Sequence, residues 1–123
     1  MISGQFGSRG ELLFEIDLIA ADEERFTVEA LLDTGFIDWS AINIQDAESL
    51  GWTLIEPERA MQTAKGEEFF DLYVGKILLD GQEFTIPVYA GENISEILMG
   101  LQWLQQRRLV VDVLKRVLTL ENS

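Results

Sequence analysis

The feature that most constrains the fold is a series of short apolar segments separated by turn-forming residues. The first two segments, residues 12–18 and 25–32, alternate apolar with polar side chains and flank an acidic loop at residues 22–24. Alternation with a period of two is typical of strands that bury one face. Two such segments joined by a short polar loop predict an antiparallel hairpin. A chain made of many such segments must pair its strands into sheets.

The same kind of pattern continues along the chain. The turn Asp80-Gly81 is a strong hairpin signal, Glu56-Pro57-Glu58 predicts a break, and Pro87 predicts an edge position or a bulge. Gly51 is expected to end a helix, because glycine accepts the left-handed cap conformation. Further strands are predicted at 39–44, 52–55, 59–64, 69–74, 76–79, 83–89, 94–99, 109–113 and 117–120, with short helices at 45–50 and 101–107. Together, these predicted strands and helices indicate one mainly β domain spanning residues 1–123.

Composition excludes several kinds of chemistry. The chain has no Cys and no His, which excludes disulfides, thiol nucleophiles, Ser-His mechanisms and most zinc sites, so we expect no cofactor and no metal. The formal net charge of −13 disfavours nucleic acids and anionic membranes as partners. Glu15 and Asp17 interrupt the first apolar run, and no apolar run is long enough to span a bilayer, so we expect a cytoplasmic location. Any catalysis must rest on carboxylates, Lys, Tyr, Ser or Thr.

One apolar segment, Ala30-Leu31-Leu32, runs directly into Asp33-Thr34-Gly35-Phe36. A carboxylate at the end of a buried strand is costly to desolvate, so it has hydrogen-bond partners or a chemical role. In an ordinary strand exit, Asp33 would only accept hydrogen bonds within the turn. An Asp-Thr-Gly triplet arises by chance in about a few per cent of chains of this length. The rest of the chain must decide between the two interpretations.

Three other features favour structural interpretations. Residues 4–10 are glycine-rich but neither follow a strand nor open a helix, which favours a hairpin arm with a turn over a phosphate-binding loop. Trp39, Trp52 and Trp103 are favoured as core or interface residues over ligand-stacking surfaces. The acidic residues lack the spacing of a calcium loop and predict solvated surface.

Taken in order, these features resemble the retroviral-type (retropepsin-like) aspartic peptidases, most of all their single-domain bacterial relatives. The resemblance covers residues 4–121. It rests on a hairpin leading into residues 30–36, a strand and helix closing with Ser49-Leu50-Gly51, a polar hairpin tip Thr63-Ala64-Lys65-Gly66 in the place of the family's flap, and Ile97-Leu98-Met99-Gly100 before a short helix. It implies the acid-protease fold, a closed β-barrel-like domain with two short helices.

The resemblance also implies an activity, an aspartic endopeptidase that hydrolyses peptide bonds as a homodimer. The catalytic residues would be Asp33, Thr34 and Gly35 of each chain, since no other Asp is followed by Thr-Gly or Ser-Gly. Two carboxylates sharing one proton would then act on a peptide or protein substrate. Residues of the flap and the site walls would contact that substrate, namely Ala64, Lys65, Gly66, Phe36, Met99 and Gly100.

Two features depart from the viral pattern. Viral members have Ala or Ser after the glycine and an acidic residue soon after, whereas this chain has Phe36, and Asp38 is not in clear register. Viral chains also end near the position of Val113 with a strand that builds the dimer sheet, while this chain continues through residues 114–123. These departures keep open a second function, a non-catalytic peptide- or protein-binding module on the same fold. The oligomeric state at micromolar concentration discriminates between the two, because the peptidase requires a dimer.

Overall fold

The computed structural model describes residues 1–122, so the predicted domain is described except for Ser123, and its chain is predominantly strand. The strands are β1 (Ile2–Ser3), β2 (Gln5–Phe6), β3 (Leu12–Ile19), β4 (Arg25–Leu32), β5 (Ser40–Asn43), β6 (Thr53–Thr63), β7 (Gly66–Leu79), β8 (Gln82–Gly91), β9 (Ile97–Met99), β10 (Arg107–Asp112) and β11 (Val117–Asn122). The helices are α1 (Ile44–Ser49) and a short 3-10 helix, η1 (Leu101–Leu104).

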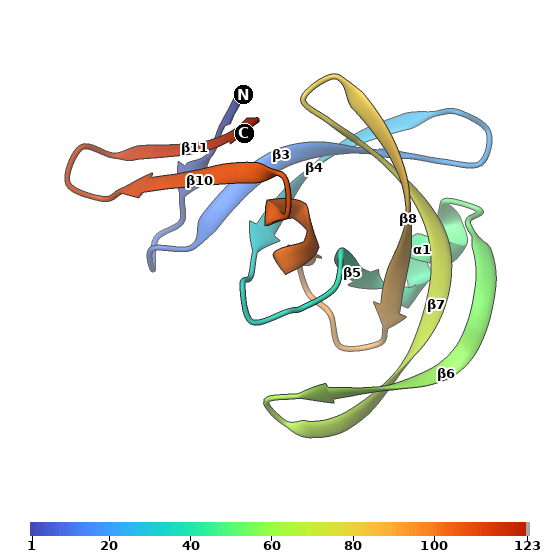
Figure 1. Ribbon diagram of the computed structural model, residues 1–123. Coiled ribbons are helices and arrows are strands. Elements are labelled where there is room, and N and C mark those ends of the chain that lie inside the picture. The colour runs from blue at the N-terminus through green and yellow to red at the C-terminus, as the bar shows by residue number, and fades with distance from the viewer. Residues whose placement is uncertain (123) are drawn as a thin grey trace.

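Six of the strands close into a barrel, in the order β3-β4-β9-β5-β8-β7 (Figure 1). The barrel closes where β7 pairs back with β3, through Asp17↔Leu78 and Leu18↔Ile77. The buried side chains inside it are mainly apolar, and the largest fully buried ones are Trp103, Phe14, Ile19, Ile42, Ile77, Leu79, Met99 and Val88. This arrangement confirms the predicted mainly β fold with a closed, barrel-like domain and few helices.

The β3–β4 hairpin brings the chain to Asp33. Its two strands pair in register from Leu13↔Leu31 to Ile19↔Arg25, and Phe14 and Ile16 are buried while Glu15 between them is exposed. This is the alternation that the sequence predicted. At its far end β4 also pairs in parallel with β9, through Leu32↔Met99. The last residues of β4 are therefore held on both edges, which fixes where the chain leaves the barrel.

The predicted break at Glu56-Pro57-Glu58 is wrong, because β6 runs without interruption from Thr53 to Thr63. The pairing with β7 shifts register between Leu54 and Glu56 and again between Glu56 and Arg59. Glu58 lies at φ +51°, and its N–H donates to Asp71 Oδ1 at 3.0 Å. The proline and its neighbours thus form an irregularity within one strand, which bends the strand without ending it.

Other turn signals lie close to their predicted places. Asp80 and Gly81 both have positive φ, the geometry of the two-residue turn between β7 and β8. Gly51 follows α1 at φ +71°. Pro87 is exposed and lies just before Val88, where the pairing of β8 with β5 begins, so it has no partner residue on β5.

The second helix is shorter than predicted, because Arg107 already belongs to β10. No helix within residues 1–122 combines the length and apolarity needed to cross a membrane.

Two of the tryptophans are core residues. Trp103 is fully buried and donates its indole N–H to Ser40 Oγ at 3.1 Å, and Trp52 donates to the carbonyl oxygen of Ile19 at 2.8 Å. Trp39, which is half-buried, packs edge-to-face on Trp103 at a centroid distance of 5.0 Å. Each buried indole therefore has a hydrogen-bond acceptor inside the core.

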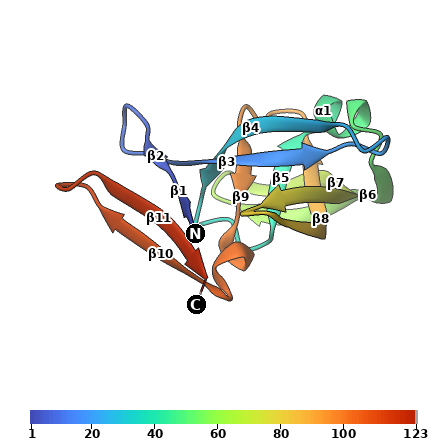
Figure 2. The same ribbon diagram turned by 90° about the horizontal axis from the view of Figure 1, so that it is seen from above.

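The two ends of the chain form a second, three-stranded sheet in the order β1-β11-β10. Figure 2 shows this sheet lying apart from the barrel, and the antiparallel pairing of β1 with β11 places Ile2 opposite Leu120. One face of β11 nevertheless belongs to the main core, since Leu118 and Leu120 are buried among the barrel's residues. The terminal sheet is thus anchored to the barrel by its middle strand.

Candidate active site

The turn after β4 holds the Asp33 carboxylate at the edge of the barrel. The N–H of Asp33 donates to the carbonyl oxygen of Met99 at 2.9 Å, continuing the β4–β9 pairing by one residue. The N–H of Gly35 donates to Asp33 Oδ1 at 2.9 Å, and the N–H of Phe36 donates to the carbonyl oxygen of Asp33 at 3.1 Å. An Asp side chain that caps its own turn in this way has a fixed direction. Asp33 is half-buried, and Thr34 beside it is exposed.

The loop that follows this turn crosses the start of η1 at very close range. The N–H of Leu101 donates to the carbonyl oxygen of Phe36, and the N–H of Gly100 donates to that of Trp39, both at 2.7 Å. A Cβ atom at Gly100 would lie 2.0 Å from the carbonyl oxygen of Asp38. The two loops can pass only because residue 100 has no side chain. The apolar-apolar-Gly element therefore positions the Asp33 loop through its backbone.

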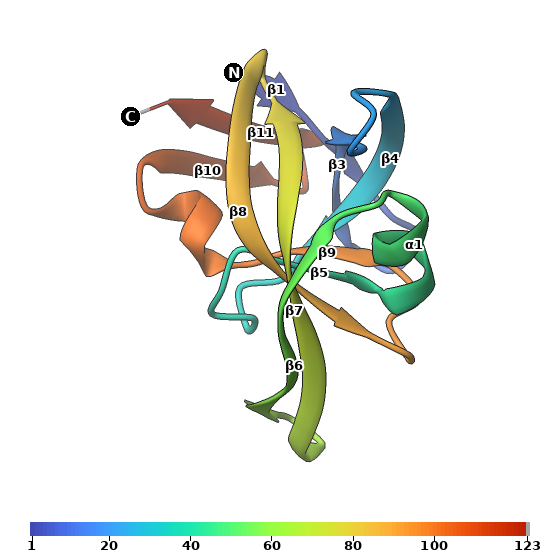
Figure 3. The same ribbon diagram turned by 90° about the vertical axis from the view of Figure 1, so that its right-hand side faces the viewer.

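The long β6–β7 hairpin forms the opposite wall of the site. Figure 3 shows this hairpin extending beyond the body of the molecule. Its tip turns at Ala64 and Lys65, and Gly66 follows at φ +107°. Thr63 Oγ1 donates to a carboxylate oxygen of Glu68 at 2.7 Å and accepts the N–H of Lys65 at 3.2 Å. These bonds hold the tip together, while the rest of the projecting hairpin depends on its own strand pairing.

A cavity of about 480 Å³ lies between the Asp33 turn and this hairpin. A volume of this size is typical of clefts that bind ligands. Its lining is mostly apolar, with Asp33 and Glu68 as its two carboxylates within the described residues. The residues that line it are Asp33, Gly35, Phe36, Ile37, Ala41, Met61, Gln62, Thr63, Ala64, Lys65, Glu68, Phe70, Ile94 and Leu98. The arrangement suits an extended chain with apolar side chains lying across a carboxylate.

Aromatic packing supports the floor of this cavity. Tyr89 is buried and makes edge-to-face contacts with Phe36 and Phe70, at centroid distances of 5.9 and 6.2 Å. Burial, together with the negative charge of Asp38, raises the pKa of the Tyr89 hydroxyl. Tyr89 therefore stays neutral at ordinary pH. Asp38 thus lies beside Tyr89, and it is not among the residues that line the cavity.

The structure brings five of the predicted site residues together around the cavity, namely Asp33, Gly35, Phe36, Ala64 and Lys65. Four others lie outside its lining. Thr34 is exposed in the turn, and Gly66 lies at the base of the hairpin tip. Met99 is fully buried, so it acts on the site through the carbonyl oxygen that binds the Asp33 N–H. Gly100 lies behind the Asp33 loop, where it allows the close crossing.

The sequence interpretation missed much of the apolar lining. Met61 and Phe70 lie on the hairpin, and Ala41 and Leu98 lie on barrel strands. The alternation of side-chain direction along a strand could have identified the lining residues that lie on the hairpin. Met61 pairs with Glu68 across the hairpin, and directly paired residues share a face, so the side chains of Met61, Glu68 and Phe70 all point to the same side. Within residues 1–122, no cluster of three or more carboxylate, Cys or His side chains could hold a metal ion.

Comparisons with known proteins give matches among solved structures only. No family model matches the sequence, and no curated protein matches it. A retropepsin-like aspartic protease from Rickettsia conorii is 23% identical, with a TM-score of 0.72 over 98% of this chain and 89% of that one.

Two viral proteases are also similar. EIAV protease, solved with the inhibitor HBY-793, is 15% identical, with a TM-score of 0.61 over 82% of this chain and 91% of its own. Simian foamy virus (mac) protease is 19% identical, with a TM-score of 0.53 over 79% of this chain and 99% of its own. Since the three structures match 79–98% of this chain, the chain has the retropepsin-like fold.

Proposed function

We propose that this protein is an aspartic endopeptidase that cleaves extended peptide segments as a homodimer. The observation that carries the proposal is the fixed Asp33 carboxylate on the wall of a largely apolar cavity, opposite a projecting hairpin. The retropepsin-like fold supports it, because one similar solved structure is described as an aspartic protease and two others as proteases.

One carboxylate is not enough for this chemistry. Aspartic proteolysis uses two carboxyl groups that share one proton, since two negative charges about 3 Å apart cannot both persist. The other carboxylate in the cavity, Glu68, lies on the hairpin and accepts a hydrogen bond from Thr63. We therefore assign the second catalytic carboxyl group to Asp33 of a second copy, related by a twofold axis.

The reaction then follows from the two protonation states. The ionised Asp33 takes a proton from a water molecule, and the resulting oxygen attacks the carbonyl carbon of the peptide bond. The protonated Asp33 of the other chain donates its proton to the carbonyl oxygen. As the tetrahedral diol collapses, the carboxyl group that took the proton from water passes it to the leaving nitrogen, the other carboxylate takes a proton from a diol hydroxyl, and the C–N bond breaks, so the two carboxyl groups again share one proton.

The neighbouring residues have supporting roles in this proposal. The N–H of Gly35 donates to the carboxylate and keeps it in one orientation. Thr34 is exposed, so its hydroxyl is available to the corresponding turn of the second copy. The β6–β7 hairpin would close over the substrate and pair with its backbone as an added strand. Apolar residues such as Met61 and Leu98 would receive apolar side chains of the peptide.

The test is cleavage of a mixed peptide library from about pH 4 to about pH 7 by the wild type and by Asp33→Asn. Because Asn keeps the shape but cannot take up the proton, we expect cleavage by the wild type and none by the variant. Asp46→Asn is the matched control, since Asp46 is exposed on α1, outside the cavity, and should leave cleavage intact.

Two results would contradict the proposal. Cleavage by Asp33→Asn with unchanged sequence preference would show that Asp33 is not the catalytic group. The absence of cleavage by the wild type, at a concentration where sedimentation shows a dimer, would favour a peptide-binding module on the same fold.

A further inference from the structure

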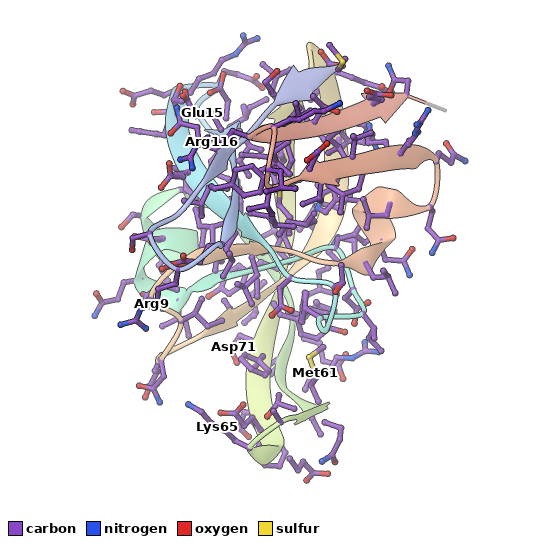
Figure 4. All side chains as sticks on the ribbon, turned by 90° about the vertical axis from the view of Figure 1, so that its left-hand side faces the viewer. Arg9, Glu15, Met61, Lys65, Asp71 and Arg116 are labelled. Atoms are coloured by element: carbon purple, nitrogen blue, oxygen red, sulfur yellow. The ribbon has the colours of Figure 1, made fainter. Side chains whose placement is uncertain are left out.

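A second cavity, of about 490 Å³, adjoins the cavity that holds Asp33, and we name it the side cavity. The two cavities have four lining residues in common, namely Lys65, Glu68, Phe70 and Ile94. From there the side cavity continues along residues 90–94, at the end of β8 and in the loop that follows. In Figure 4, Met61 lies on one side of the β6–β7 hairpin, and Asp71 and Lys65 lie on the other. A peptide that lay over Asp33 would therefore have a second space beside it, open to a long side chain.

Contacts within the chain fix the walls of the side cavity. Phe70 packs so closely on the end of β8 that a Cβ atom at Gly91 would lie 2.7 Å from its ring. The loop after β8 is tied to β5, because the side-chain amide of Asn43 donates to the carbonyl oxygens of Glu92 and Ile94, both at 3.5 Å. Both walls of the side cavity thus belong to the fold of one chain.

The two cavities differ in the charge of their linings. The side cavity is lined by one ammonium group, on Lys65, and by four carboxylates, a net charge of −3; the carboxylates belong to Glu58, Glu68, Asp71 and Glu92. Lys65 is exposed at the hairpin tip and forms no ion pair within residues 1–122, so it does not neutralise these carboxylates from a fixed position. A cationic side chain entering the side cavity would be attracted, and an anionic one would be repelled.

Glu68 is the carboxylate that lines both cavities. It is half-buried, and its Oε2 accepts the hydroxyl of Thr63 at 2.7 Å, which fixes the direction of the side chain. Within residues 1–122, no hydrogen bond or ion pair engages its other oxygen. Phe70 and Ile94 share this part of the lining, and a charge-assisted hydrogen bond beside apolar groups is stronger than one in open water. Glu68 is thus placed to bind a cation that enters from the Asp33 cavity.

We propose that the side cavity is a subsite for a lysine or arginine side chain of the substrate, and that Glu68 selects it. This rests on the proposed function, since it assigns a substrate class to the same site. Successive side chains of an extended peptide point to opposite sides, so one can enter the side cavity while its neighbours lie in the Asp33 cavity. The Asp33 cavity is mostly apolar, so the preferred substrate is an apolar segment that contains one basic residue.

The first test compares arginine with citrulline, its uncharged isostere, at each position in turn of a peptide that the wild type cleaves. We expect one position at which arginine gives a kcat/KM about tenfold above that of citrulline, because only arginine forms a charged hydrogen bond with Glu68. This advantage should shrink at high ionic strength, since the attraction is electrostatic. Equal kcat/KM values at every position would overturn the subsite.

Glu68→Gln tests the selecting residue, with Glu67→Gln as its matched control. The amide oxygen introduced by Glu68→Gln can still accept the Thr63 hydroxyl, so the hairpin tip keeps its hydrogen bond. Glu67 precedes it on the same strand, is exposed and lies outside both cavities. We expect Glu68→Gln to remove most of the arginine advantage and Glu67→Gln to keep it. An arginine advantage that survives in Glu68→Gln would overturn the role of Glu68.

A binding measurement separates this inference from the proposed function. Immobilised Asp33→Asn is exposed to the mixed peptide library in two versions, one with arginine and one with citrulline in its place, and the retained peptides are identified by mass spectrometry. We expect preferential retention of the arginine peptides, lost in the double variant Asp33→Asn/Glu68→Gln.

The two proposals then fail in different ways. If the wild type cleaves peptides and Asp33→Asn retains both versions equally, the peptidase stands and the subsite fails. If the wild type cleaves nothing and Asp33→Asn retains arginine peptides through Glu68, the subsite stands and the peptidase fails. Equal retention of the two versions overturns the subsite whether or not the wild type cleaves.

Discussion

In the Asp33 turn, the backbone N–H groups have hydrogen-bond partners, while polar side-chain groups remain open to further contacts. Three backbone N–H groups, from Asp33, Gly35 and Phe36, are satisfied within the turn or by β9. Within residues 1–122, no hydrogen bond engages the second carboxylate oxygen of Asp33, which lines the cavity, or the hydroxyl of Thr34, which is exposed beside it. In the proposed function, a single chain therefore supplies a rigid half of a two-carboxylate site.

Gly100 gives the clearest residue-scale prediction. In Gly100→Ala, the new methyl group would meet the backbone oxygen of Asp38, which cannot move without shifting the Asp33 loop. We expect a loss of about 3 kcal/mol in the free energy of unfolding, measured with urea, together with loss of cleavage.

Gly7→Ala is the control for Gly100→Ala. Its methyl group would meet the side chain of Glu11, whose exposed carboxylate can move away by exchanging its hydrogen bond from the Arg9 N–H for one with water. A similar loss of stability in both variants would contradict the role assigned to the loop crossing.

Sequence patterns found some of these residues and missed others. The run 30–36 identified Asp33 and Gly35 because a carboxylate and a glycine directly after an apolar strand are a local signal. Tyr89 was not identified as a neighbour of Phe36, since their contact joins β8 to a loop 53 positions earlier in the chain. Nor could the spacing show that Met99 faces the core and serves Asp33 through its carbonyl oxygen.

At the scale of elements, the β6–β7 hairpin combines a firm base with a lightly supported tip. Its base pairs with β8 on one side, whereas its tip is held by the bonds around Thr63. Local stability is low where backbone pairing is exposed and buried apolar contacts are few. In the proposed function, this suits the tip to open and close over a substrate.

Gly66→Ala tests the tip, with Gly10→Ala as a matched control. Both glycines have positive φ, +107° and +87°, and neither position has an atom within 4 Å of the added methyl group. Each variant should lose about 1 to 3 kcal/mol locally, because L residues disfavour this backbone geometry. We expect Gly66→Ala alone to lower kcat/KM, by about tenfold, measured on a peptide that the wild type cleaves. Equal kcat/KM values for the two variants would contradict a role of the tip in catalysis.

The predicted bounds of secondary-structure elements were correct where the local sequence determines them. The limits of β4 match the predicted 25–32 because alternation and the acidic loop define the segment at both ends. The break at 56–58 failed because Asp71, on the neighbouring strand, accepts the N–H of Glu58 and supports the irregular backbone. Such support comes from tertiary pairing and leaves no trace in the local sequence.

At the scale of the whole molecule, charge opposes both folding and association. The net charge of −13 is spread mainly over the body, with few compensating ion pairs. Raising the ionic strength from about 0.01 M to about 0.15 M shortens the screening length from about 30 Å to about 8 Å. We expect Tm to rise by about 2 to 5 °C, measured by circular dichroism.

Sodium and potassium chloride should give the same rise in Tm, since screening does not depend on the identity of the cation. A fall in Tm with added salt would show that attractive pairs outweigh the repulsion.

The pairing of β1 with β11 has a mechanical consequence. In this antiparallel pair, Ile2 lies opposite Leu120 and Ser3 opposite Thr119, so Met1 and Asn122 are at the same end. A force that pulls these two residues apart would open the pair one bond at a time, as in unzipping, before the strands of the barrel separated. Under weak tension, β1 should therefore separate from β11 first, while the barrel, closed by the pairing of β3 with β7, stays intact.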